Sequence, residues 1–121
     1  MVKSKRYRED AEENYNKHYF DLSMFSLHQS LELFLKGMLI LRSGDFPHTH
    51  SLRSLLELLK KFVNDRCTES ISKFLADYNM EISVLTDAYI TSRYFESNYN
   101  ELTVSRLIKL VINMEDDLDV C

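Results

Sequence analysis

A stripe of polar side chains runs through an otherwise apolar stretch near the middle of the chain. His28, Glu32 and Lys36 recur every four residues, and Gln29 lies beside them. On a helix this spacing places all three on one face, and Glu32 before Lys36 is the favourable order for an ion pair. Imidazole, carboxylate and ammonium groups together can also bind a polar ligand or transfer protons. The stripe is therefore either an ion-paired ridge or the wall of a site.

Two further histidines, His48 and His50, are separated by one residue in the segment that follows. That spacing can chelate a metal ion, but no cysteine or further histidine lies nearby in sequence to complete a ligand shell. A local role is favoured, with His50 forming hydrogen bonds at the start of the next helix. The chain also lacks Glu-x-x-His pairs, an HExxH motif and a glycine-rich phosphate loop. No metal and no cofactor are expected.

The segment 20–41 must position the stripe. It contains no proline and carries apolar residues on nearly every side. A helix that is apolar all round has to be covered all round. At about 1.5 Å per residue it extends roughly 33 Å, which is the diameter of a small domain. We therefore predict a central helix with other helices packed along its length.

Composition points to an all-α fold. The chain has 121 residues, two glycines, one proline and no tryptophan, so it lacks the turn residues of a β-rich fold. The remaining periodic segments are 52–64, 68–78, 81–95 and 103–118, with 4–16 as a surface helix. They predict a single domain, 1–121, folded as an up-and-down antiparallel bundle of four long helices plus one short helix.

The expected cellular location and the net charge of the chain limit the functions that it can have. The chain opens without a signal-peptide pattern, and its apolar run is too short and too charged to span a bilayer, so a cytoplasmic protein without a membrane partner is expected. Cys67 and Cys121 show no pairing pattern and are predicted to be free thiols in a reducing cytosol. A net charge of -4 argues against an extended nucleic-acid surface but leaves room for a small phosphate site.

Three short motifs resemble the HEPN domain (higher eukaryotes and prokaryotes nucleotide-binding domain). They are His28-Gln29-x-x-Glu32-x-x-x-Lys36-Gly37, then Pro47-His48-Thr49-His50-Ser51-Leu52 with Leu55-Leu56, then Tyr89-x-x-Ser92-Arg93-Tyr94. The resemblance implies a helical bundle that usually forms a homodimer. It also implies a possible partner, because members are often encoded beside a minimal nucleotidyltransferase in toxin-antitoxin or defence modules. Many members are metal-independent ribonucleases.

The family's ribonuclease signature is an arginine and a later histidine with four to six residues between them. Here Arg93 is followed at those positions by Asn98, Tyr99 and Asn100, with no histidine. Asparagine cannot accept a proton at neutral pH, and loss of a general base costs about a hundred- to ten-thousand-fold in rate. Weak or absent cleavage is expected unless His28, His50 or a histidine from a partner chain serves as the base.

If the site is catalytic, the resemblance assigns Arg93 to charge stabilisation and Asn98 and Tyr99 to orienting the substrate. Arg93 could instead pair with Glu96 or Glu101 at a helix end.

Three functions remain open at this stage. The first is a nucleotide- or RNA-binding module with a degenerate ribonuclease motif, acting as half of a two-protein module. Its ligand would lie between the central helix and the helix that ends near Arg93, in a cleft lined by Lys36, Arg93 and the stripe of His28, Gln29 and Glu32. His50 is a further candidate contact, and Tyr89, Tyr94 or Tyr99 could stack on a base. The second is a metal-independent ribonuclease toxin. The third is a non-catalytic scaffold whose exposed tyrosines form an interface.

Overall fold

The computed structural model describes residues 2–94 and 99–121, except for the side chains of Val2 and Arg93. All regular structure in this part is helical, which confirms the predicted fold class. The helices are α1 (Val2–Asn16), α2 (Phe20–Ser43), α3 (Leu52–Leu59), α4 (Asp65–Asp77), α5 (Asn79–Tyr94) and α6 (Glu101–Leu118). The predicted count of four long helices and one short one is not confirmed, because six helices lie in the described residues.

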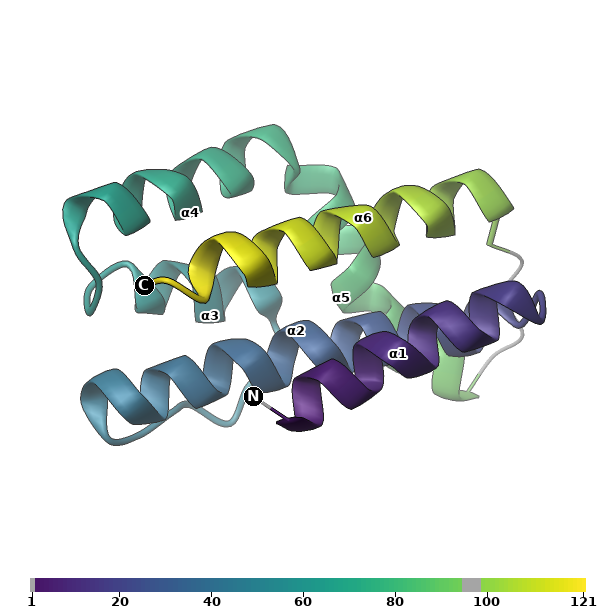
Figure 1. Cartoon of the computed structure of the whole chain (residues 1–121), viewed down its shortest axis with the longest axis horizontal. Helices are drawn as coiled ribbons and strands as arrows, with labels where there is room; N and C mark the ends of the chain where they lie inside the picture. The colour runs from purple at the N-terminus through teal and green to yellow at the C-terminus, as the bar shows by residue number, and fades with distance from the viewer. Residues whose placement is uncertain (1, 95–98) are drawn as a thin grey trace.

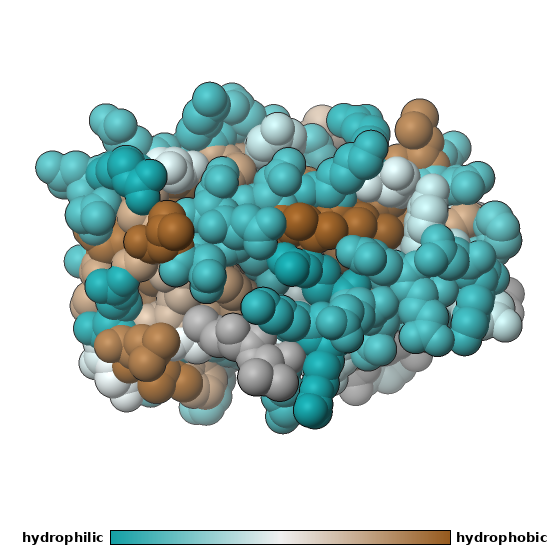
Figure 2. All heavy atoms as spheres, viewed as in Figure 1, coloured by the Kyte–Doolittle hydropathy of each residue, from teal (hydrophilic) through white to brown (hydrophobic). Residues whose placement is uncertain are grey.

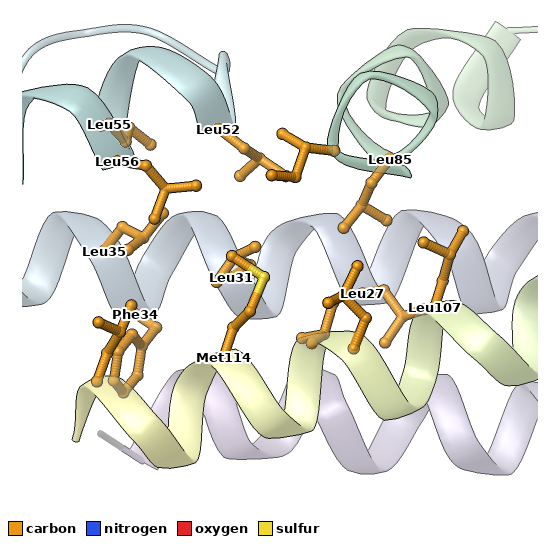
Figure 3. Packing of buried hydrophobic residues seen from close by; sticks show 14 of the residues in the cluster. Leu27, Leu31, Phe34, Leu35, Leu52, Leu55, Leu56, Leu85, Leu107 and Met114 are labelled. Atoms are coloured by element: carbon orange, nitrogen blue, oxygen red, sulfur yellow. The ribbon is translucent and has the colours of Figure 1, made fainter. Parts of the chain in front are cut away.

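Helix α2 is the centre of the bundle. It contacts α1, α3, α5 and α6, and Figure 1 shows α1 running alongside it. Figure 3 shows its leucines meeting side chains from α3 and α5 on one side and from α6 on the other. Leu27, Leu31 and Leu35 are fully buried. Each buried leucine contributes about 1.5–3 kcal/mol, so this helix supplies much of the hydrophobic driving force for folding.

Helix α1 packs one narrow face along α2 and leaves most of its other side chains exposed, as expected of a surface helix. Ala11 is fully buried, and the Ser23 hydroxyl of α2 donates a hydrogen bond of 2.7 Å to the Ala11 carbonyl. Helix α1 also contacts α6, and Figure 1 shows the two lying side by side. The small side chain of Ala11 leaves room for α2 to come close to the α1 backbone at this hydrogen bond. Tyr7, Ala11 and Tyr15 recur every four residues and predict the packed face of this helix; Ala11 is buried, and the two tyrosines are half-buried.

Local signals place most helix ends where the sequence predicts them. Gly44 ends α2 in the left-handed conformation with φ 84°, which a glycine adopts without steric cost. Ser51 caps α3, and Asn100 caps α6 by accepting from the Leu102 amide at 2.7 Å. Helix α3 is shorter than predicted, because the chain turns after Leu59 and Asn64 caps the next helix.

The two cysteines form a disulfide, so the prediction of free thiols is wrong. Cys67 at the start of α4 is bonded to Cys121 at the end of the chain, and their Cα atoms lie 6.1 Å apart. In Figure 1 the C-terminus lies near the beginning of α4. The pair is separated by 54 residues in sequence. No short spacing could reveal it, because only the packing of α6 along α4 brings the two side chains together.

Candidate functional site

The polar stripe of α2 is buried and does not form a solvated ridge. His28 is fully buried and Glu32 is 5% exposed. The Lys36 ammonium lies 3.6 Å from a Glu32 carboxylate oxygen and 5.4 Å from the centre of the Phe46 ring. A buried carboxylate is tolerated only when charge and hydrogen bonds compensate it. The Lys36 charge is therefore engaged inside the protein.

Glu32 also binds the imidazole of His50. The distance from Glu32 Oε1 to His50 Nδ1 is 2.6 Å, and the His50 side chain is 52% exposed. A carboxylate accepts hydrogen bonds, so Nδ1 carries the proton. The outer nitrogen of a neutral His50 ring, Nε2, then has a free lone pair. A carboxylate that fixes the tautomer of a half-exposed imidazole is an arrangement that general bases use.

His28 holds the His50 main chain in place. Its Nε2 donates to the His50 carbonyl at 2.8 Å, which fixes the position of the hydrogen on that nitrogen. Burial lowers the pKa of His28, so the ring is neutral and Nδ1 can only accept. The Gln29 amide, 3.4 Å away, is consistent with this tautomer when its NH₂ group faces the ring. His28 is thus an anchor for His50 rather than an exposed ligand.

Tyr89 of α5 completes the cluster. Its ring stacks on His50 with centroids 4.0 Å apart and an interplanar angle of 18°, and it lies 5.0 Å from His28. On α2, Phe25 stacks on the same tyrosine at 6.1 Å. The cluster therefore joins three parts of the chain, which are α2, α5 and the loop that precedes α3. Lys36 contacts Glu32 in this cluster, as the periodicity suggested.

The HEPN domain family model matches residues 1–118, which is nearly the whole chain. The chain belongs to the HEPN family. No curated protein and no solved structure matches the chain significantly. Along the described helices of this HEPN domain, none is long and apolar enough to cross a membrane.

The residues of the degenerate ribonuclease motif in this HEPN domain are only partly described. Asn98 and the side chain of Arg93 lie outside the described residues. The Arg93 backbone is in the last turn of α5, four residues after Tyr89. Tyr99 is partly buried and packs against the hydrophobic core. The roles of these three residues remain predictions.

No group of three or more potential metal ligands is clustered within residues 2–94 and 99–121 of the HEPN domain. The His48 ring packs edge-on against Phe46 at 5.7 Å instead of joining His50. A groove of about 620 Å³ lies between α4 and α6, and it is lined by none of the predicted site residues whose side chains the structure describes. Figure 2 shows the face that carries α1 and α6, where hydrophilic atoms surround a narrow hydrophobic strip. The polar cluster around Glu32 is thus separate from this groove.

Proposed function

We propose that this HEPN domain binds a nucleotide or single-stranded RNA at His50 and Tyr89. The observation that carries the proposal is the half-exposed His50 ring, which Glu32 orients at 2.6 Å and Tyr89 supports by stacking at 4.0 Å. A rigid, partly exposed aromatic surface with a polar edge is suited to a nucleobase, because stacking needs no base-specific contact. The ligand would be the nucleotide or RNA itself. The protein partner would be the nucleotidyltransferase half of a two-protein module.

The internal network supports this assignment because it preorganises His50. Its main-chain carbonyl is held by His28, and its side chain is held by Glu32. Ordering these groups before the ligand arrives removes an entropic cost of binding. Because the chain has a net charge of -4, we expect a short ligand footprint rather than a long one.

The test is RNA binding measured by fluorescence anisotropy with a short labelled single strand. His50→Ala is expected to weaken binding about ten-fold or more, because loss of one stacking contact costs about 1–3 kcal/mol. His48→Ala is the matched control, since His48 is exposed in the same loop and contacts Phe46 instead. Equal affinity of the two variants would refute a site at His50.

Metal-independent RNA cleavage is the second candidate, favoured by the Glu32–His50 pair alone. His50 Nε2 would accept the proton of the attacking ribose 2′-hydroxyl, in place of the histidine missing after Arg93, and Arg93 would stabilise the phosphorane charge. His50→Asn keeps an amide donor for Glu32 but removes the base. Cleavage of RNA in the presence of a chelator should then fall about a hundred-fold or more. Intact RNA at high concentrations of the unaltered protein would end this proposal.

An apolar surface on α5 supports the binding of a second copy of the chain or of a partner protein. Met80, Ile90 and Tyr94 are 75%, 57% and 66% exposed. Tyrosine and methionine are enriched at interfaces. A homodimer should elute at twice the monomer mass, and Ile90→Glu should return it to a monomer. Co-expression with any nucleotidyltransferase encoded beside this HEPN domain tests the other partner, and recovery of the HEPN domain alone would exclude a tight complex.

A further inference from the structure

The groove between α4 and α6 is a second candidate binding site, apart from the His50–Tyr89 stack. Its volume of about 620 Å³ is within the range of clefts that bind ligands in proteins. In Figure 1 the two helices run in opposite directions, with the start of α4 near the end of α6. The Cys67–Cys121 bond joins these two ends and so limits how far the walls can separate there.

Three cationic side chains line the groove, and they come from both of its walls. Lys73 belongs to α4, whereas Arg106 and Lys109 are three residues apart on one face of α6. All three residues are exposed. In the part of the chain that the structure describes, no carboxylate forms an ion pair with any of them, although Asp77 and Asp117 also line the groove. These three groove cations are therefore available to an anionic ligand.

Apolar surface lies next to these charges. Phe74 and Tyr78 of α4 line the groove, and their ring centroids are 6.4 Å apart. A second hollow of about 340 Å³ adjoins the groove, because Arg106 lines both, and its lining includes the exposed Met80 and Val84 of α5. A ligand that fills this surface needs negative charges and apolar groups side by side.

An acidic, amphipathic peptide segment matches this surface better than a nucleic acid does. Its carboxylates can pair with the groove cations while its apolar side chains contact the aromatic wall and the second hollow. An RNA strand carries a phosphate at every nucleotide, and Asp77 and Asp117 repel those phosphates that do not meet a cation. In a peptide complex the same aspartates can accept hydrogen bonds from N–H groups.

We propose that the groove between α4 and α6 binds an acidic, amphipathic segment of a partner protein. The carboxylates of the segment pair with the groove cations, and its apolar side chains contact Phe74, Tyr78 and Met80. This site is independent of nucleotide or RNA binding at the stack, because neither His50 nor Tyr89 lines the groove or the second hollow.

The test measures the binding of three labelled probes by fluorescence anisotropy. They are a short amphipathic peptide of leucine and glutamate, the same peptide with glutamine in place of glutamate, and a single-stranded oligouridylate. The unaltered protein should bind the acidic peptide about ten-fold or more tightly than the neutral one, because only the acidic peptide can pair with the groove cations. Added salt should reduce this difference, since the cations are exposed.

Substitution of the groove cations locates the binding site. Lys109→Gln should weaken the acidic peptide about two- to five-fold, which is the effect of losing one exposed ion pair. The triple variant Lys73→Gln, Arg106→Gln and Lys109→Gln should bind the acidic and neutral peptides equally. Lys61→Gln is the matched control, because it removes one exposed positive charge from outside the groove. The urea midpoint should be the same for all variants, since none of these side chains is buried or ion-paired in the described structure.

Three results would overturn the proposal. The first is equal affinity of the unaltered protein for the two peptides, or an equal loss in Lys61→Gln and Lys109→Gln. The second is tighter binding of the oligouridylate than of the acidic peptide, lost in the triple variant, because the groove would then bind nucleic acid. The third is loss of peptide binding in His50→Ala, which would place the peptide at the stack. If the groove binds the peptide, His50→Ala leaves its affinity unchanged, whether or not RNA binds at His50.

Discussion

The buried Glu115 is expected to make the free energy of unfolding depend on pH. This α6 residue is 3% exposed, and its carboxyl oxygen lies 2.6 Å from the Ser30 hydroxyl of α2. The same hydroxyl lies 2.8 Å from the main-chain oxygen of Ser4 in α1. The Arg8 guanidinium is 3.8 Å from the carboxylate. Burial raises the pKa of Glu115 from 4.5 to about 7, more than the Ser30 hydrogen bond and Arg8 can offset.

The protonated carboxyl fits this junction better than the ionised one. Ser30 has a single proton, so it can donate either to Glu115 or to Ser4, but not to both. When Glu115 is protonated, it donates to Ser30 and Ser30 donates to Ser4. When Glu115 is ionised, Ser30 donates to the carboxylate and its bond to α1 is lost. Ionisation therefore weakens the contact between α1 and α2.

The sign and size of the effect follow from linkage. Between pH 4.5 and about 7 the folded protein holds a proton on Glu115 that the unfolded chain has released. The free energy of unfolding therefore falls as the pH rises from 4.5 to about 7. Above about pH 7 the contribution of Glu115 no longer changes. At about 1.4 kcal/mol per pH unit, the loss is about 3 kcal/mol.

Glu115→Gln removes this titration and keeps an amide donor for Ser30. We expect the variant and the unaltered protein to be equally stable near pH 4.5, and the variant to be more stable by up to about 3 kcal/mol near pH 8. Urea unfolding at a series of pH values measures the difference. His28, whose lowered pKa makes stability fall below about pH 6.5, titrates in both proteins and cancels. Asp116→Asn is the control, because Asp116 is an exposed neighbour of Arg8.

A stability difference between Glu115→Gln and the unaltered protein that does not change between pH 5 and pH 8 would refute this reasoning. It would mean that Glu115 is ionised in the folded state throughout that range.

Two further predictions concern long-range contacts. Replacing Cys67 and Cys121 by serine should lower the free energy of unfolding by about 4 kcal/mol, because the bond closes a loop of 54 residues; an equal urea midpoint with and without reductant would contradict this. Lys36→Met should cost about 3 kcal/mol, because it leaves the buried Glu32 carboxylate without its cation. An unchanged urea midpoint for Lys36→Met would show that His50 alone compensates Glu32.

Much of the candidate site was within reach of the sequence. The period of four residues placed His28, Glu32 and Lys36 on one face of α2, and the family motifs added His50 and Tyr89. The pairing of Glu32 with His50 was not predictable, because it depends on how the loop before α3 lies against α2.

The sequence alone determined the helical class, the central position of α2 and most helix ends. These features depend on interactions within a few residues, such as the left-handed Gly44 and the Asn100 cap, or on an apolar surface that must be covered. Tertiary structure alone decided the Cys67–Cys121 bond, the docking of α1 and the proton on Glu115. Each of these depends on side chains far apart in the chain, whose distance and exposure to water are fixed only when the helices pack.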